Sequence, residues 1–423
     1  MRINPLSSDF YSGNRTKIEQ NLPDGAIAII HSNDEMPRNG DQYFPYRQSS
    51  DMLYLTGIEQ EQSVLVISKI QGWPTTLFIR RPNLMLETWE GKKLEIDEAR
   101  KICGIEKIQY IENYEGWIKE AMTLTNVVYL NSNEYPKFFP SINSRDERLG
   151  LDLRNRFPLH EYRRLAPLLW ECRAIKESEE INRLHDAISI TGEAFRSILK
   201  DSHPGMKEFE IEAIMSYHFT KHGATHAYQP IVASAVSACT LHYTTNHQLI
   251  NDDSLVLLDF GAEYGGYAAD CSRTFPISGH FTPRQQQCYE AVLRVMEKTI
   301  PLYTPGNTIN SINKQVYLWM EPEAIKLGLL KEDEVKAAGE GVLIQKYFMH
   351  GTAHFLGLDV HDVGRKDMPF KKGMVLTCEP GIYIKEEGIG IRIEDNIMVA
   401  DKPVNLMQFI PKEVEDIEKL SKK

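Results

Sequence analysis

The sequence predicts an α/β domain followed by a second domain that contains an internal repeat. Residues 1–172 alternate between strand-like and helix-like segments, which is typical of an α/β domain. After residue 173 the order helix, helix, hairpin occurs twice, and each hairpin carries two acidic residues in apolar strands. A chain of 423 residues is too long for one ordinary core. We therefore expect two domains, over residues 1–172 and 173–423.

Apolar runs predict the strands of the first domain. They lie at residues 25–30, 62–68, 75–80 and 126–130, and residues 97–104 are helix-like. Only His31 and His160 of the thirteen histidines fall in this domain, so metal chemistry is not expected there. Trp89 stands among charged residues, so we expect it to be exposed and a candidate for an interface.

The second domain begins with an amphipathic helix from residue 174, whose apolar face is formed by Ile181, Leu184, Ile188 and Phe195. The first repeat continues with HPGM at 203–206, a second helix and a hairpin, and the second repeat has TPGN at 304–307 in the matching place. Thr282 and Gln285 form a capping box with proline between them at the first helical position, which predicts the start of the second repeat.

The first hairpin, residues 255–276, has the sequence LVLLDFGAEYGGYAADCSRTFP. A turn centred between Tyr264 and Gly265 would place Asp259 directly opposite Asp270, with Cβ atoms roughly 4.5 to 5.5 Å apart. Two such carboxylates repel each other unless a cation lies between them. The alternative is a surface hairpin with a bulge that points the acids apart.

The second hairpin, residues 379–394, repeats this construction and places Glu379 opposite Glu394. Between the hairpins lie His350, His354 and His361, in a run of small and apolar residues. Four carboxylates and one neutral imidazole carry about four negative charges, which two divalent cations would neutralise. Oxygen-rich ligation with one histidine suits Mn²⁺, Co²⁺ or Zn²⁺.

The composition excludes several classes of protein. Hydrophobic content of 42% and charged content of 25% are those of a soluble globular protein, and a net charge of −11 without a basic run disfavours nucleic acid as a partner. No apolar stretch is long enough for a membrane span and no signal sequence is visible, so a cytoplasmic location without membrane association is expected. The six cysteines form no CxxC pair, and Cys271 and Cys378 are expected to be packing residues beside the acids.

The acids and histidines stand in the segments DFGAEYGGYAADCSRTFP, HGTAHFLGLDVHDVG, EPGIYI and GIRIEDN. These resemble the dinuclear metallopeptidases with the pita-bread fold, in the proline-specific branch that contains aminopeptidase P and prolidase. The resemblance implies a creatinase/aminopeptidase P-like α/β N-terminal domain and an α+β pita-bread catalytic domain with pseudo-twofold symmetry. Residues 43–58 resemble the part of that N-terminal domain that shapes oligomer contacts, so a homodimer or homotetramer is expected.

The resemblance also implies the roles of the site residues. Asp259 binds one metal ion, Asp270 and Glu394 bridge both ions, and His354 and Glu379 complete the ligand set. Mn²⁺ is the first choice of metal, with Zn²⁺ or Co²⁺ as alternatives. Solvent bridging the ions would act as hydroxide, and Glu379 would accept its proton.

The family pattern places three further histidines beside the metals as catalytic groups, namely His242, His350 and His361. Their use would be to bind the scissile carbonyl, the developing oxyanion or the proline side of the substrate. Three other residues would orient the acids and the substrate: Tyr228, Tyr383 and Arg392. Four other histidines have no such context and are expected on the surface or in packing: His222, His226, His247 and His280.

These residues predict a metal-dependent Xaa-Pro aminopeptidase acting on peptides with proline second. Prolidase, restricted to Xaa-Pro dipeptides, is the alternative, and a non-catalytic binding protein on the same scaffold is a third possibility that loss of ligands would favour. None of the five ligands is missing. A prolidase needs a cation for the dipeptide carboxylate, but the cations between the last histidine and Glu379 stand in a polar loop: Arg365, Lys366, Lys371 and Lys372. We therefore expect longer peptides to be cut as well.

Overall fold

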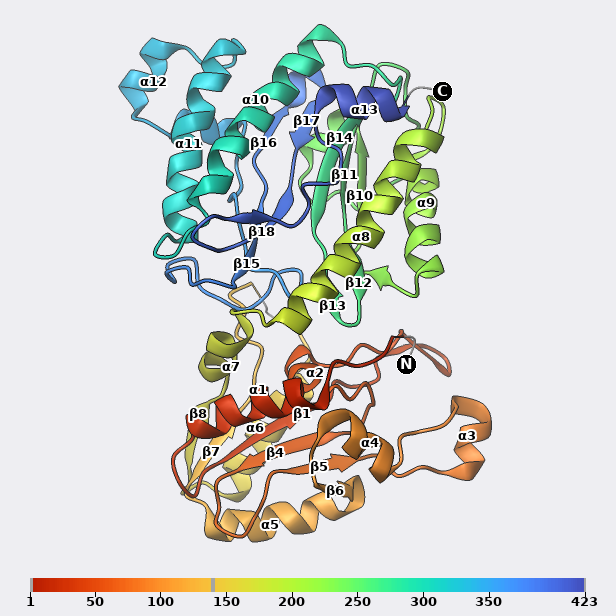
Figure 1. Cartoon of the computed structure of the whole chain (residues 1–423), viewed down its shortest axis with the longest axis vertical. Coiled ribbons are helices and arrows are strands. Elements are labelled where there is room, and N and C mark those ends of the chain that lie inside the picture. Colours follow the sequence, from red (N-terminus) through yellow and green to blue (C-terminus); the bar gives the residue numbers. More distant parts are fainter. Residues whose placement is uncertain (1–2, 138–140, 422–423) are drawn as a thin grey trace. The chain divides into compact units, whose positions relative to one another are not determined.

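The computed structural model describes residues 3–137 and 141–421 of the chain, which divides into two compact units, Met1–Arg173 and Ala174–Lys423 (Figure 1). The sequence placed this division one residue earlier, after residue 172. Each unit is described by itself below.

The N-terminal unit is built on a mixed six-stranded sheet flanked by helices, which agrees with the predicted α/β domain. The strand order is β6 (Lys107–Tyr110), β5 (Thr76–Ile79), β4 (Val64–Ser68), β1 (Ile27–His31), β7 (Val127–Leu130) and β8 (Glu161–Arg164). β1 pairs antiparallel with β4 and parallel with β7. Every residue of β1 and β4 is buried, so both faces of the sheet are covered.

Helices and one short hairpin complete this unit. They are α1 (Ser8–Gln20), β2 (Pro37–Asn39), β3 (Gln42–Tyr43), α2 (Ser50–Thr56), α3 (Leu84–Glu90), α4 (Ile96–Cys103), α5 (Tyr114–Leu124), α6 (Arg145–Arg156) and α7 (Ala166–Arg173). The expected helix at 97–104 is confirmed as α4. Trp89 on α3 is 87% exposed, which confirms its expected exposure.

The C-terminal unit contains the predicted repeat of two helices and a hairpin. The first pair is α8 (Ser178–Asp201) and α9 (Glu208–Lys221), and the second pair is α10 (Pro283–Thr299) and α11 (Ile309–Lys326). Both pairs turn through a glycine with positive φ, 83° at Gly205 and 93° at Gly306, which explains the matching HPGM and TPGN segments. The capping box at Thr282 is present.

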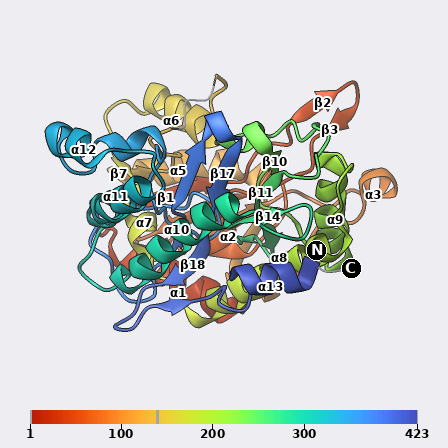
Figure 2. The same cartoon turned by 90° about the horizontal axis from the view of Figure 1, so that it is seen from above.

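Two short helices, α12 (Glu332–Ala338) and α13 (Val414–Ser421), complete this unit. In both views α8 and α10 lie on the same side of the strands (Figures 1 and 2). Within residues 3–137 and 141–421, no helix combines the length and apolar character needed to cross a membrane.

The strands of this unit form two antiparallel hairpins with short flanking strands. The first half contains β9 (Thr225–His226), β10 (Ile231–Ser234), β11 (Leu255–Phe260), β12 (Ala262–Tyr264), β13 (Tyr267–Ala268) and β14 (Cys271–Pro276). The second half contains β15 (Val375–Cys378), β16 (Gly381–Ile384), β17 (Ile389–Arg392), β18 (Asp395–Met398) and β19 (Val404–Asn405). β11 pairs with β14, and β15 pairs with β18.

The first hairpin turns one residue later than the sequence predicted. Tyr264 pairs with Tyr267, so the two residues of the turn are Gly265 and Gly266, whose φ angles are 57° and 83°. A two-residue turn with positive φ at both positions matches the twist of the strands, and two glycines adopt it at little cost. The Gly-Gly pair therefore determined the turn, and the expected centre before Gly265 was wrong.

This later turn changes the partner of the first acid. Asp259 pairs with Ser272, not with Asp270, so the two acids lie diagonally across the hairpin. The register differs from the expected one by two residues, an even number, so both acids still lie on the same face. Gly261, between β11 and β12, has no room for a side chain, since a Cβ there would lie 1.8 Å from the Ala269 carbonyl oxygen.

The second hairpin has the register that the sequence predicted. Gly381 pairs with Arg392 and Cys378 pairs with Asp395. Glu379 and Glu394 continue the same register between these pairs, so they lie directly across from each other. This confirms the expected turn at Glu386 and Glu387, which lie in a short 3₁₀ turn (Lys385–Glu387) closed by a glycine.

Candidate metal centre

Asp259 and Asp270 converge on one tyrosine. The Tyr228 hydroxyl lies 2.6 Å from Asp259 Oδ1 and 2.6 Å from Asp270 Oδ1. Because a hydroxyl has only one proton, it cannot donate fully to both carboxylates. The alternative in which a bulge points these acids apart is therefore wrong, although they are diagonal neighbours.

Glu394 brings a carboxylate of the second hairpin to the same place, and its side chain is buried. Its Oε2 accepts a hydrogen bond of 2.6 Å from the Ser272 hydroxyl on β14. Its other oxygen, Oε1, is buried and has no hydrogen-bond partner. A buried carboxylate oxygen without a donor is costly, so this atom is available for a positively charged ligand.

His354 is held beside the acids because its segment runs along β15 like an added strand. The amide of Thr377 donates to the His354 carbonyl, and the amide of Glu379 donates to the Thr352 carbonyl. The His354 Nδ1 contacts the Phe355 carbonyl at 3.0 Å, which identifies Nδ1 as the protonated nitrogen and leaves Nε2 facing the acids. His354 Nε2 is 3.2 Å from Asp270 Oδ2 and 3.8 Å from Glu379 Oε1.

Burial and crowding shift the pKa values of these groups. Burial, with the charges of Asp270 and Glu379, raises the pKa of Glu394 well above its usual value. Burial also raises the pKa of Glu379 to about 7, although the neighbouring His354 acts in the opposite direction. Burial alone would lower the pKa of His354, but its hydrogen bond with Asp270 raises it to about 9. The acids therefore require positive charge to remain ionised together.

These residues fit divalent metal ions. One ligand atom each from Asp270, His354 and Glu394 lies within 4.8 Å of the other two. The set is rich in carboxylate oxygen and has one imidazole and no thiolate, which suits a first-row divalent ion. The unpartnered Glu394 Oε1 supports the same conclusion.

Arg392 connects the acids of the two hairpins. Its Nη2 donates to Asp259 Oδ2 at 2.5 Å, its Nη1 to the Tyr383 hydroxyl at 2.9 Å, and its Nε to the Ser272 hydroxyl at 2.7 Å. All three kinds of guanidinium N–H are used, which fixes the plane of the group. Arg392 and Tyr383 therefore lie in contact with each other beside the acids, and their orienting role stays a prediction. Ser272 was missed, although its position two residues after Asp270 puts it on the same face of the strand.

Buried side chains that the sequence did not reveal join the two hairpins. Asn396 Nδ2 donates to the Asp270 carbonyl at 2.6 Å, and its Oδ1 accepts from the Asp270 amide at 3.3 Å. Arg273, which is fully buried, donates to Asp395 Oδ1 at 2.6 Å and to the Glu394 carbonyl at 2.6 Å. The Asn396 and Asp395 contacts join positions 126 and 122 residues apart, so no local pattern could have found them.

Both ring nitrogens of His350 have a hydrogen-bond partner, and one of these partners belongs to the second hairpin. Its Nδ1 lies 2.8 Å from the Gly351 carbonyl, and its Nε2 lies 2.8 Å from the Tyr383 hydroxyl. The carbonyl can only accept, so Nδ1 carries the proton and Tyr383 donates to Nε2. Burial, with the charge of Arg392, lowers the pKa of His350 to about 3. The ring is therefore neutral, and it lies 3.7 Å from Glu379 Oε2.

His242 and His361 are exposed, unlike the histidines above. The ring of His361 packs nearly at right angles on His354, with ring centres 4.4 Å apart. His242 follows a short 3₁₀ turn (Ala235–Cys239), and its charge helps to lower the pKa of His350. The structure thus brings these two predicted histidines to the edge of the ligand set.

The other histidines that the sequence assigned to packing or to the surface behave in different ways. His226 packs on Phe219 and its Nε2 contacts Ser216, His247 contacts Tyr243, and His280 faces Glu418. His222 pairs with Glu193 and is considered further below. Cys271 and Cys378 are fully buried, and burial raises the pKa of both thiols, which agrees with packing roles.

Comparison with known proteins gives a consistent result over the whole chain. Residues 182–401 match metallopeptidase family M24, and residues 11–129 match the aminopeptidase P N-terminal domain. The chain is 34% identical to the Xaa-Pro aminopeptidase of Escherichia coli, over 99% of this chain and 98% of that protein.

Two solved structures agree with this match. Zinc-substituted E. coli aminopeptidase P in complex with product has a TM-score of 0.88 at 34% identity, covering 99% of both chains. Proline aminopeptidase P II from Yersinia pestis has a TM-score of 0.89 at 33% identity, covering 98% of this chain and 99% of that one. The predicted fold and the predicted family are confirmed, and the chain belongs to metallopeptidase family M24, among its Xaa-Pro aminopeptidases.

Proposed function

We propose that the C-terminal unit hydrolyses the bond between an N-terminal residue and a following proline. The observation that carries this proposal is the convergence of four acids and His354 at the junction of two hairpins, in a chain of this family. A non-catalytic binding role on the same scaffold is disfavoured because all five groups are present.

The ligand set supports two divalent ions, for which we propose Mn²⁺ first and Zn²⁺ or Co²⁺ as alternatives. The residues that would hold them are Asp259, Asp270, His354, Glu379 and Glu394. When bound, such ions would lower the pKa of a bridging water so that it reacts as hydroxide near neutral pH. Asp270 and Glu394 are the proposed bridges, since both approach His354 closely and Glu394 Oε1 has no other partner.

Glu379 is the proposed acceptor of the proton from the attacking water. Its two oxygens lie 3.8 Å from His354 Nε2 and 3.7 Å from His350 Nδ1, so the carboxylate lies between the two rings. Arg392 and Tyr383 hold the surrounding groups in place and leave Glu379 without a strong hydrogen bond of its own. A base with this freedom can take and return a proton during turnover.

The three proposed catalytic histidines differ in how exposed their side chains are. His242 and His361 can meet a substrate directly because both are exposed beside the site, so we propose that they bind the substrate carbonyl or the proline side. His350 has both nitrogens engaged, and Tyr383 would have to release Nε2 before His350 could contact a substrate. Its proposed role is therefore to support Glu379 and Tyr383.

The cations beyond His361 favour an aminopeptidase over a prolidase. Arg365 is exposed and pairs with Asp367 through contacts of 2.8 and 2.9 Å, and Lys372 is exposed and pairs with Asp401 at 2.6 Å. Lys366 and Lys371 are also exposed. None of the four is a buried cation that could clamp the carboxylate of a dipeptide.

Mass spectrometry of cleaved peptides tests this function. We expect Xaa-Pro-Yaa and longer peptides to be cut at least as well as Xaa-Pro, and matched Xaa-Ala-Yaa peptides to resist. The reason for the second expectation is that proline has no N–H and fixes its own φ, so the site must accept an imide. Hydrolysis of dipeptides alone, stopped by amidation of their carboxylate, would replace the proposal with prolidase.

Three further expectations from the sequence stay predictions. They are the homodimer or homotetramer with residues 43–58 at its contacts, the cytoplasmic location, and a functional boundary after residue 172. Sedimentation and limited proteolysis would test the first and the third.

A further inference from the structure

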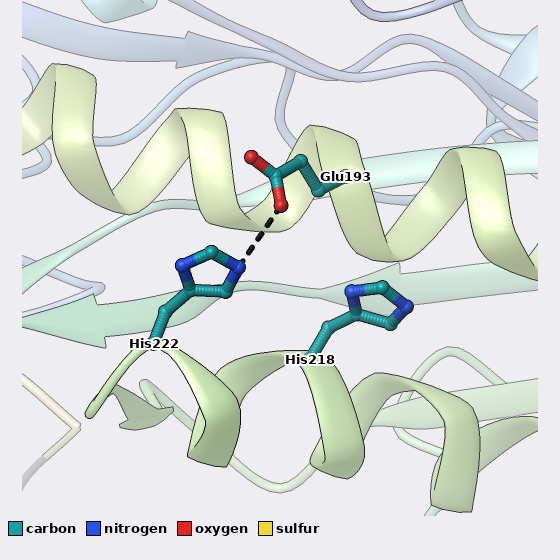
Figure 3. A group of neighbouring side chains, drawn as sticks. All are labelled: Glu193, His218 and His222. Atoms are coloured by element: carbon teal, nitrogen blue, oxygen red, sulfur yellow. Dashed lines mark ion pairs between the residues drawn. The ribbon is translucent and has the colours of Figure 1, made fainter.

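Two helices outside the peptidase centre bring together a second group of metal-binding side chains. Glu193 comes from α8, His218 comes from α9, and His222 is the C-cap residue directly after α9. The two histidines are four positions apart, so they share one face of the helix. Figure 3 shows the Glu193 carboxylate reaching from α8 toward the two rings. One ligand atom of each residue lies within 4.8 Å of the other two.

Two ring nitrogens in this group, one from each histidine, have no hydrogen-bond partner. His218 Nδ1 and His222 Nε2 are both shielded from solvent and unpartnered. Glu193 Oε2 is 3.0 Å from His222 Nε2, close enough for an ion pair but not aligned as a hydrogen bond. A shielded nitrogen without a partner has lost its hydrogen bonds to water and has gained none from the protein, which costs free energy. Such atoms are therefore suited to a ligand that approaches between the helices.

The electrostatics at His218 favour the form that binds a metal. Burial, with the charge of Lys221, lowers the pKa of His218 below its usual value, although Glu193 and Asp201 act in the opposite direction. That shift favours the neutral ring, and neutral imidazole is the form that binds metal ions. The Glu193 carboxylate adds the negative charge that a cation requires.

We propose that Glu193, His218 and His222 bind one Zn²⁺ ion that joins α8 to α9. Two imidazole nitrogens and one carboxylate form a common ligand set for zinc, with water in the fourth position. Ligand atoms around tetrahedral zinc are about 3.3 Å apart, so no pair has to close by more than about 1.5 Å, which side-chain rotation can provide. Because the set has two nitrogens and one oxygen, Zn²⁺ is preferred here over Mn²⁺.

This ion would link two helices and would be separate from the peptidase centre. It would hold together the two helices of the first repeat, which carry no proposed ligand of that centre. The matching helices of the second repeat, α10 and α11, contain no histidine. The site therefore belongs to one half of the repeat only.

Equilibrium dialysis against micromolar Zn²⁺ tests the proposal. In the full chain we expect His218→Ala with His222→Ala to lower the Zn²⁺ content by one per chain. His185→Ala, an exposed histidine on α8, is the matched control and should leave the content unchanged. Glu193→Gln should weaken binding at least about tenfold, because it removes the charge of one ligand. Peptidase activity after loading with Mn²⁺ should be equal in the wild type and in these three variants.

A second background separates this site from the peptidase centre. In Asp270→Asn with Glu394→Gln we expect one Zn²⁺ to remain, and the two histidine substitutions should then remove it. Equal Zn²⁺ binding with and without His218 and His222, in both backgrounds, would overturn the proposal. If Glu193→Gln binds Zn²⁺ with unchanged affinity, Glu193 is not a ligand and the ion does not join α8 to α9. A chain that binds Zn²⁺ here but fails to cut peptides would contradict only the proposed function.

Discussion

The first hairpin closes with two glycines, whereas the second closes with a four-residue turn that ends in one glycine. In the first, Gly265 and Gly266 both have positive φ, and Asp259 and Asp270 lie diagonally across the strands. In the second, Gly388 alone has positive φ, and Glu379 and Glu394 lie directly across from each other. The two halves of the repeat therefore present their acids with different spacing.

This difference shows which feature of a hairpin matters for assembling the centre. Diagonal neighbours are roughly 7 to 8 Å apart, so a third group is needed to connect them, and Tyr228 contacts both. Because the observed register of the first hairpin differs from the expected one by an even number of residues, Asp259 and Asp270 still face the same side. A turn one residue longer or shorter on one strand alone would have pointed one acid away.

Replacing one acid in each hairpin tests whether the two halves contribute equally. We expect Asp270→Asn and Glu394→Gln each to lower kcat by about 10³-fold or more, because each removes a buried charge from the metal ligands. Rates and metal content per chain should be measured together. Glu387→Gln is the control, since Glu387 lies in the second turn and pairs with Arg284. Near-normal turnover at full metal content would contradict the assignment of these two acids as metal ligands.

Arg273→Met tests the junction between the hairpins. The partner, Asp395, is fully buried and would keep only Lys412 as a cation at 2.9 Å. We expect a loss of about 3 kcal/mol in the free energy of unfolding, because the variant leaves a buried charge poorly compensated. Urea unfolding measures this loss. Lys336→Met, which removes an exposed ion pair with Glu332, is the control and should leave the free energy of unfolding unchanged. A stable variant would show that the junction does not depend on this pair.

The same pair predicts a dependence on pH. Burial alone would raise the pKa of Asp395, but Arg273 and Lys412 lower it to about 2. The folded value lies below the unfolded value of about 3.9, so this contribution to stability is complete above that value. It is lost as the pH falls through 2. Removing Arg273 should move this loss to higher pH, which unfolding curves between pH 2 and about 5 would reveal.

Tyr383→Phe separates positioning in the second hairpin from ligand binding. The change removes the acceptor of Arg392 Nη1 and the donor to His350 Nε2. We expect kcat to fall about tenfold, or roughly 1.4 kcal/mol of barrier, with little change in KM. Tyr317→Phe is the matched control because the Tyr317 hydroxyl contacts only the backbone carbonyl of His350, at 3.2 Å. Equal effects of both changes would argue against the role of Tyr383.

The turn glycines should give the smallest effect. We expect Gly266→Ala to cost about 1 kcal/mol of unfolding free energy, because alanine resists positive φ. Gly265→Asn should be nearly neutral, since asparagine tolerates that conformation and Asn-Gly suits such turns. Urea unfolding of both variants measures the difference. A neutral Gly266→Ala would mean that the Gly-Gly pair does not determine the register.

Local chemistry was enough to predict much of this protein. Four of the six strands of the N-terminal sheet, the repeat of helix pairs and the start of α10 depend on residues close together in the chain, so their patterns can be read directly. The second hairpin was also predicted correctly. The first was not, because the prediction centred the turn between Tyr264 and Gly265, whereas Gly265 and Gly266 are the pair that adopts positive φ at both positions.

The tertiary structure alone decided how the centre is held together. Ser272 contacts Glu394 and Arg392, and Asn396 hydrogen-bonds the Asp270 backbone as a neighbouring strand would. These contacts join residues more than a hundred positions apart in the chain. The group formed by Glu193, His218 and His222 is likewise invisible in the sequence, since its members become neighbours only when α8 packs on α9. Types of side chain and their local spacing are properties of the chain itself. Which distant groups share one buried volume depends on packing, which no local pattern records.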